Sequence, residues 1–217
     1  MNIKEYVDNL CIRAKNAAKQ ISCIDENTKN LILKAIIDEL DNNREKIISA
    51  NNNDVEEFKL SKNFARSFLD RLLINNERID AIIESIKEII LFKDPVGEIK
   101  DIKTMPSGIK VGKMAMPLGV IAMIYESRPN VTIDASALSI KSGNAIILRG
   151  GSESINTNIE LLNCIEKALI KNNIDKNIVQ LVDNVDRKIV NELLTQNNYI
   201  DIVIPRGGKN LIKLIDE

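Results

Sequence analysis

The segment from Pro117 to Ser152 restricts the fold of this chain more than any other part of the sequence. It contains a short apolar run over 120–124, a run of apolar and small residues at helical spacing over 130–143, and a second apolar run over 145–148. Short apolar runs bounded by glycine and polar residues are typical of strands buried on both faces. A strand, a helix and a second strand in this order predict a parallel sheet.

The helix predicted over 130–143 has a recognisable start and end. Asn130 or Thr132 can cap its first turn, because a short polar side chain can accept a hydrogen bond from a free backbone N–H group there. Gly143 stands where a helix commonly ends in a left-handed backbone conformation.

Further segments extend the predicted sheet. We expect an amphipathic helix over 154–172, a strand over 178–182, a helix capped by Asp186, a strand over 200–204, and a last helix from Gly208 to the end of the sequence. The inward residues of the first of these helices are predicted to be Ile155, Ile159, Leu162, Ile165 and Leu169. Four strands alternating with helices predict an α/β fold with a doubly wound, mostly parallel sheet that is covered on both faces.

Residues 1–97 have the apolar spacing of helices, which we interpret as cover for the sheet. The expected elements are a helix over 3–21, a second from Asp25 to about Ile48, a break over 51–54, a shorter helix from Phe64 to Leu72, and a helix over 79–90 that ends before Pro95 and Gly97.

Residues 98–116 form two short extended runs joined by Met105-Pro106-Ser107-Gly108. Proline followed two residues later by glycine is typical of a turn, so this segment is predicted to be a β-hairpin. A lone hairpin is only marginally stable in water, and we therefore expect it to pair with a sheet of a partner subunit or of a missing part of the chain.

The composition excludes several classes of function. The chain has 30 basic and 31 acidic residues and a net charge of −1, which gives nucleic acid or a membrane surface no electrostatic basis as a partner. No apolar run approaches the ~18 residues of a membrane span, and the N-terminus has no apolar signal region. The three cysteines lack metal-ligand spacing and histidine is absent, so we expect no metal site, reduced thiols and a cytoplasmic protein.

The strand ends form the candidate site. In a doubly wound sheet the carboxyl ends of the strands lie along one edge, which brings together 125–130, 149–152, 183–184 and 206–209. Three arginines and a lysine meet there, beside glycine pairs that let backbone N–H groups approach a ligand closely. A Gly-Gly pair can also be only a tight turn, and such an arginine only a solvated charge. Two loops with the same Arg-Gly-Gly sequence favour an anion site, most simply for a phosphate-bearing nucleotide, although the G-x-G-x-x-G motif is absent.

The strings PLGVIAMIYESRPNVTIDASALSIKSGNAIILRGGSES and DIVIPRGGKNLI closely resemble the γ-glutamyl phosphate reductases of the aldehyde dehydrogenase superfamily. The resemblance implies NADPH-dependent reduction of L-glutamate 5-phosphate to L-glutamate 5-semialdehyde in proline biosynthesis. It further implies that 1–97 is the helical part of an aldehyde dehydrogenase-like cofactor domain, that 98–116 is a hairpin through which a homo-oligomer forms, and that 117–217 is a Rossmann-like NADP-binding sheet.

The resemblance also assigns roles to residues. Asn130 matches the asparagine whose amide N–H stabilises the oxyanion, so it is the predicted catalytic residue. Arg149 matches the strand-end lysine that reaches the adenosine ribose, and an arginine there favours NADPH over NADH. Ser152 or Glu153 lies near the ribose-binding glutamate, and Arg128 meets either the cofactor or the substrate phosphate. The predicted cofactor-binding residues are Ser127, Arg128, Pro129, Arg149, Gly150, Gly151, Ser152, Glu153, Arg206, Gly207 and Gly208.

One feature departs from the family. Its nucleophilic cysteine, which would displace phosphate to form a thioester, belongs to a later domain, and Cys11, Cys23 and Cys164 do not match its position. We therefore expect the cofactor-binding half of a longer enzyme, without its catalytic domain and inactive by itself. Two other hypotheses are a stand-alone nucleotide- or anion-binding module and an interaction domain whose hairpin pairs with a partner.

Overall fold

The computed structural model describes residues 2–61, 66–208 and 211–212. Its centre is a parallel four-stranded sheet in the order β5-β4-β3-β6. The strands are β3 (Val120–Tyr125), β4 (Ala145–Arg149), β5 (Val179–Leu181) and β6 (Ile202–Arg206). The predicted parallel sheet is confirmed, and its two inner strands are the apolar runs of the segment from Pro117 to Ser152.

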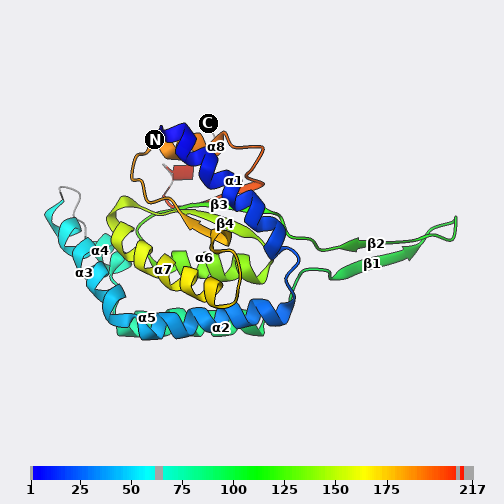
Figure 1. The fold of residues 1–217 in the computed structure, drawn as a ribbon, viewed down its shortest axis with the longest axis horizontal. Coiled ribbons are helices and arrows are strands. Elements are labelled where there is room, and N and C mark those ends of the chain that lie inside the picture. The colour runs from blue at the N-terminus through cyan, green and yellow to red at the C-terminus, as the bar shows by residue number, and fades with distance from the viewer. Residues whose placement is uncertain (1, 62–65, 209–210, 213–217) are drawn as a thin grey trace.

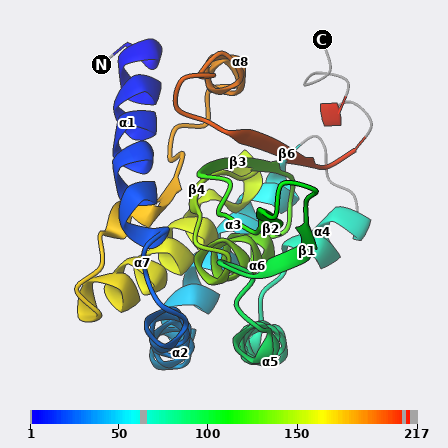
Figure 2. The same cartoon turned by 90° about the vertical axis from the view of Figure 1, so that its right-hand side faces the viewer.

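Helices cover both faces of this sheet (Figures 1 and 2). On one face lie α1 (Ile3–Ile21) and α8 (Lys188–Leu194), and on the other lie α6 (Asn130–Lys141) and α7 (Ile155–Lys171). A further layer, α2 (Glu26–Asn42) and α5 (Asn76–Leu91), packs against α7 and α6, and α3 (Arg44–Leu60) packs against α7. The N-terminal helices thus cover the sheet only in the case of α1, while α2, α3 and α5 cover other helices.

The helix starts and breaks differ from the prediction in three places. Residues 51–54 lie inside α3, and the chain breaks earlier, at Asn43. The residue before α6 is Pro129, and neither Asn130 nor Thr132 caps the helix with its side chain. Phe64 and Lys209 lie outside the described residues, as does most of the last predicted helix. Gly143 follows the end of α6 with φ of 74°, as predicted.

Asn51 and Asp54 explain why the predicted break is wrong. Both side chains are buried, and both bind other parts of the chain instead of turning the backbone. The Asp54 carboxylate accepts hydrogen bonds from the backbone N–H and side-chain groups of Asn156 and Thr157, at the first turn of α7. Asn51 donates to the Leu72 carbonyl at 2.8 Å and accepts from the Ile74 N–H at 2.7 Å, and so fixes the link between α4 (Arg66–Leu72) and α5.

The inward face of α7 and two strand boundaries also moved. Ile165 and Leu169 are buried as predicted, but Ile155, Ile159 and Leu162 are only half-buried, and Leu161 and Cys164 lie inward beside them. β6 begins two residues late because the chain around Ile200 forms a turn, in which the Ile200 N–H donates to the Gln196 carbonyl. A 3₁₀ turn over Lys176–Ile178 takes the first residue of the expected third strand.

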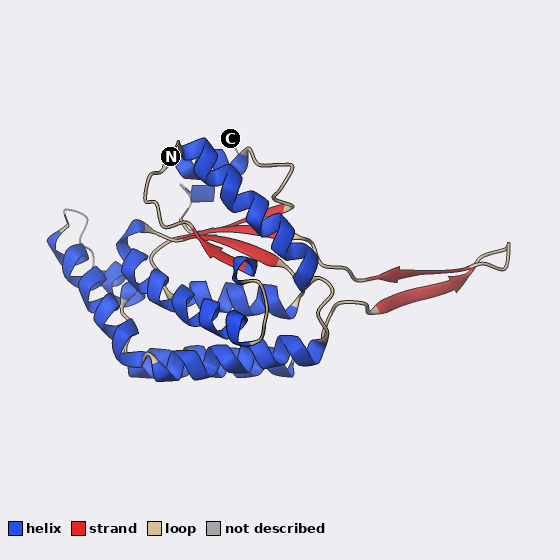
Figure 3. Ribbon diagram, in the orientation of Figure 1, coloured by secondary structure: helices blue, strands red, loops and turns tan. Residues whose placement is uncertain are grey.

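The predicted hairpin is confirmed. β1 (Ile99–Thr104) and β2 (Lys110–Met114) pair antiparallel and project from the body as an isolated two-stranded sheet (Figures 1 and 3). Every residue of both strands is exposed, including isoleucine, valine and methionine side chains.

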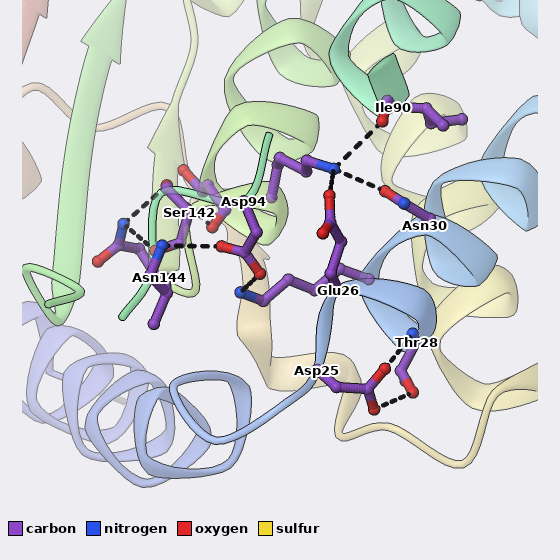
Figure 4. Close-up of polar contacts among 12 residues, drawn as sticks. Asp25, Glu26, Thr28, Asn30, Ile90, Asp94, Ser142 and Asn144 are labelled. Carbon is purple, nitrogen blue, oxygen red and sulfur yellow. Dashed lines mark hydrogen bonds and ion pairs between the residues drawn. The ribbon is translucent and has the colours of Figure 1, made fainter. Parts of the chain in front are cut away.

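Two buried lysines join the helices at the end of the body nearest the hairpin (Figure 4). Lys29 is fully buried and binds Asp94 at 2.7 Å. Lys141, at the end of α6, binds Glu26 at 3.0 Å and the Ile90 carbonyl at 3.2 Å. Buried cations of this kind are tolerated only with such partners, so these pairs fix the positions of α2, α5 and α6.

Candidate functional site

The ends of β3 and β6 enclose a cavity of about 300 Å³ at the predicted edge of the sheet. Five predicted site residues line it. These are Ser127, Arg128, Arg206, Gly207 and Gly208. They meet because β3 and β6 are parallel neighbours in which Tyr125 lies beside Arg206. The remaining wall comes from Phe68 and Arg71 of α4, with Glu126 and Val131.

A carboxylate already occupies part of the loop after β6. The Gly208 N–H donates to Glu126 Oε2 at 2.9 Å. Glycine at position 207 is required by the close approach of this side chain, because a Cβ atom there would lie 2.7 Å from Glu126 Cδ. The backbone N–H donor that would attract a phosphate is therefore held by an internal anion.

Arg149 lies next to this cavity at the end of β4, and it is nearly buried, with 9% of its surface exposed. Its guanidinium donates to the Gly150 carbonyl and, at 3.2 Å, to the Val185 carbonyl, while its Nε–H has no partner among the described residues. Burial lowers the pKa of Arg149; the Glu153 carboxylate opposes this shift and the Arg187 cation adds to it. A buried cation with a spare donor and a second cation nearby is a site for an anion.

The loop after β4 rests on a buried hydrogen-bonded chain. Tyr125 Oη binds Thr132 Oγ1 at 2.7 Å, Thr132 donates to Asn158 Oδ1 at 2.8 Å, and Asn158 donates to Ser154 Oγ at 3.0 Å. Ser154 in turn donates to the Gly151 carbonyl at 3.2 Å. Burial is the main cause that raises the pKa of Tyr125. Thr132 thus orients the strand ends instead of capping α6.

Glycine at 150 is needed for this packing. A Cβ atom there would lie 2.4 Å from Asn158 Nδ2 and 3.0 Å from the Tyr125 ring. Real atoms do not approach so closely, so any side chain at 150 would push the loop away from the Tyr125–Asn158 chain.

Glu153 connects the loops after β3 and β4. Its Oε1 accepts from the Ser127 N–H at 3.0 Å and from the Ser127 hydroxyl. Ser127 has a left-handed backbone with φ of 41°, a conformation that favours glycine and here brings its N–H to Glu153. Ser152, the other candidate for the ribose, is exposed at the start of a 3₁₀ turn. Pro129 is buried before α6, and its carbonyl accepts from the Thr132 N–H.

Asn130 lines a second cavity, of about 520 Å³, between α4, α5 and the start of α6. Its Nδ2 donates to Asp134 Oδ2 at 2.9 Å, and Ser85 donates to Asp134 Oδ1 at 3.3 Å. Burial raises the pKa of Asp134, against the lowering effect of both hydrogen bonds and of Arg206. Arg71 and Arg128 line both cavities, so these two side chains separate the second cavity from the strand-end cavity.

The structure adds site residues that the sequence analysis did not select. Phe68, Arg71 and Arg78 come from segments interpreted only as cover, and Glu126 and Asp134 were not assigned a role. Two signals were present in the sequence. Asp134 follows Asn130 by four residues, and Arg71 follows Phe68 by three, so each pair shares one helix face. In the structure the Arg71 guanidinium carbon lies 5.6 Å from the centre of the Phe68 ring.

Metal ions and membranes find little support in this architecture. No group of three or more histidine, cysteine or acidic residues in the described ranges could hold a metal ion. Within those ranges, every helix is too short or too polar to cross a bilayer.

No protein-family model matches the chain. It is 46% identical over 214 residues to the γ-glutamyl phosphate reductase of Ruthia magnifica subsp. Calyptogena magnifica, which covers 99% of this chain and 51% of that protein. The crystal structure of γ-glutamyl phosphate reductase from Thermotoga maritima superposes with a TM-score of 0.93 at 36% identity, covering 97% of this chain and 50% of that one. The chain spans about half the length of the relatives it matches. These similarities confirm the resemblance predicted from the sequence.

More distant structures share the fold alone. A probable aldehyde dehydrogenase from Listeria monocytogenes gives a TM-score of 0.76 at 21% identity over all of this chain and 45% of its own. Glyceraldehyde-3-phosphate dehydrogenase from Methanocaldococcus jannaschii, solved in complex with NADP, gives 0.74 at 16% identity over 98% of this chain and 43% of its own. The predicted aldehyde dehydrogenase-like α/β fold is thereby confirmed.

Proposed function

Because this chain has the sequence and the fold of about half of a γ-glutamyl phosphate reductase, we propose that it is the cofactor-binding part of such an enzyme. The complete enzyme would use NADPH to reduce L-glutamate 5-phosphate to L-glutamate 5-semialdehyde in proline biosynthesis. Within the chain, the observation that supports cofactor binding most directly is Arg149, a nearly buried cation with an unpartnered Nε–H at the end of a parallel strand. Ligands of open α/β sheets bind at such ends.

The residues at the strand ends fit NADP. A 2′-phosphate can accept two parallel hydrogen bonds from a guanidinium, which supports Arg149 as its partner and NADPH over NADH. Gly150 and Gly207 keep the two loops close to their supports, and Arg206 and Arg128 add positive charge at the cavity. NADPH, when bound, would supply the hydride for reduction. The chain's own residues would bind and orient it.

Asn130 is proposed to act on the substrate from the neighbouring cavity. Asp134 accepts one N–H of its amide, which fixes the side chain and leaves the second N–H to donate. A donor aimed at a developing oxyanion is typically worth ~10²–10³ in rate.

The nucleophile is proposed to lie outside this chain. Burial is the main cause that raises the pKa of Cys11 to about 12 and that of Cys164 to about 11, so both thiols remain protonated near neutral pH. Cys23 is exposed, but it lies in the turn between α1 and α2, on the side of the body nearest the hairpin. We therefore expect the chain to bind cofactor without reducing substrate.

The exposed hairpin supports a homo-oligomer and, with it, a domain boundary at 98–116. Its apolar side chains stay in water in the single chain, with Ile102 63% and Ile109 64% exposed. A partner sheet would bury them. Sedimentation of an Ile109→Lys variant tests this, because a charge at the contact should favour the monomer. The free cysteines fit a reducing, cytoplasmic location.

A stand-alone nucleotide-binding module is the second candidate, since the proposed cofactor contacts all lie in this chain while the nucleophile does not. Both candidates require cofactor binding, and hydrogen exchange tests that requirement. NADPH should slow amide exchange at 149–153 and 206–208 in the purified chain, and saturation at ~100 times the dissociation constant should stabilise it by ~2.7 kcal/mol. Unchanged exchange in both loops would refute the cofactor site. Detectable semialdehyde formation by the chain alone would refute the external nucleophile.

A further inference from the structure

The cavity between α4, α5 and α6 holds charges of both signs that lack an opposite charge inside the protein. Arg71 and Arg128 line it and pair with no carboxylate among the described residues. The Asp134 carboxylate lines the same space and pairs with no cation there; its partners are the Asn130 amide and the Ser85 hydroxyl. Arg78 differs, because its guanidinium binds the Asp70 carboxylate at 2.8 Å and the Leu73 carbonyl at 2.8 Å.

Such unpaired charges are costly where water is partly excluded. Asp134 is half-buried, and desolvation is the main cause that raises its pKa. A bound cation would offset that cost, because an opposite charge nearby favours the ionised carboxylate. The two arginines would in turn be matched by anionic groups. The cavity therefore suits a ligand that carries an ammonium group and anionic groups together.

We propose that this cavity binds the amino-acid end of an acidic α-amino acid derivative, with its α-ammonium on the Asp134 carboxylate and its anionic groups on Arg71 and Arg128. The inference rests on the proposed function and assigns the residues that would recognise the substrate. Asp134 would then be shared between two groups. One of its oxygens already holds Asn130, and the ligand ammonium would bind the free lone pairs beside it.

The position of the cavity agrees with this role. About 520 Å³ is enough for a small amino-acid derivative, and Asn130, the proposed oxyanion donor, lines the same wall one helical turn from Asp134. Arg71 and Arg128 also face the strand-end cavity proposed for the cofactor. An amino acid held at Asp134 would therefore have its reactive end between Asn130 and the cofactor.

The test uses the 217-residue chain and three probes, followed by amide resonances in two-dimensional NMR. L-Glutamate carries the ammonium and both carboxylates, glutarate lacks the ammonium, and γ-aminobutyrate lacks the α-carboxylate. We expect L-glutamate to shift resonances of 81–85 and 130–134. We expect glutarate and γ-aminobutyrate each to bind at least about tenfold more weakly, the ratio that ~1.4 kcal/mol produces.

Variants then separate the contacts. In Asp134→Asn, glutarate should bind at least as well as L-glutamate. Glu88→Gln serves as the matched control, since it removes one carboxylate from the exposed side of α5 and should preserve the wild-type preference. Arg71→Gln should weaken L-glutamate and glutarate alike. The probe series in the wild-type chain decides the question even where a variant fails to fold.

The results that overturn the proposal differ from those that overturn the cofactor site. Equal affinity of the wild-type chain for L-glutamate and glutarate, or no shift in 81–85 and 130–134 at ~100 mM of either acid, would sink the amino-acid site. NADPH protection of 149–153 would in that case leave the proposed function standing. Loss of that protection with glutamate binding intact would sink the cofactor proposal instead.

Discussion

Replacing Arg149 with methionine should remove cofactor preference at little cost in stability. Methionine keeps the apolar stem but lacks the guanidinium, whose two hydrogen bonds go to the Gly150 and Val185 carbonyls and whose Nε–H is unpartnered. Against the loss of those two bonds stands the relief of a nearly buried cation close to a second cation, Arg187. Replacing buried charges with apolar groups of similar size is often neutral, so we expect the free energy of unfolding to change by less than about 1 kcal/mol.

The effect on binding should be much larger. A guanidinium that donates two charged hydrogen bonds to a 2′-phosphate contributes about 2–3 kcal/mol, or about 30- to 150-fold in the dissociation constant. Arg149→Met should lose that factor for NADPH and keep its affinity for NADH, which lacks the phosphate. Fluorescence titration with each cofactor measures the ratio, and urea unfolding measures stability.

A matched control comes from the opposite face of the sheet. Arg13 of α1 donates one side-chain hydrogen bond, to Gln180 at 3.1 Å, and it does not line the strand-end cavity. Arg13→Met should therefore leave the preference for NADPH intact. The reasoning fails if Arg149→Met retains the wild-type ratio of NADPH to NADH affinity. It also fails if the variant loses more than about 2 kcal/mol of stability, because Arg149 would then be a structural cation.

Three further changes test separate parts of the structure. Asp54→Ala removes four hydrogen bonds to the start of α7 and should lower the free energy of unfolding by about 3–4 kcal/mol in urea; a loss below about 1 kcal/mol would contradict the buried cap. Gly150→Ala places a methyl group against Asn158 and should cost about 1–3 kcal/mol and weaken NADPH, as thermal shift with and without cofactor will measure; an unchanged melting temperature would show that the loop yields freely. Glu126→Gln removes the charge that occupies the Gly208 N–H and should tighten NADPH about threefold in fluorescence titration, whereas weaker binding would make Glu126 a cofactor ligand.

The sheet was predictable because its strands are buried on both faces. Runs such as 120–124 and 145–148 are apolar without alternation, and few other structures bury such runs. The hairpin followed from Pro106 and Gly108 at the turn, where Gly108 has φ of 83°. Parallel strands then place their carboxyl ends together, which is why Ser127, Arg206 and Gly207 could be grouped before the structure was known.

Buried polar contacts across the sequence were not predictable in the same way. Asn51 and Asp54 resemble a turn because their side chains commonly bind the local backbone. Here their partners include Thr157, more than a hundred positions away, and they lie within a helix. Nothing in the local pattern of 51–54 distinguishes the two outcomes. The role of Arg71 was hidden for the same reason, since it depends on where α4 lies relative to the strand ends.

The carboxylates at the strand ends set a limit on how strongly this site can hold a phosphate. The sequence suggested loops with free backbone N–H groups, but the Ser127 N–H donates to Glu153 and the Gly208 N–H donates to Glu126. A phosphate that takes these donors must displace an anion that already satisfies them, so each new hydrogen bond replaces an old one and its net contribution is small. The unpartnered Nε–H of Arg149 is different, because a ligand gains that bond without breaking another. Discrimination between cofactors should therefore depend on Arg149 more than on the glycine-rich loops that first drew attention to the site.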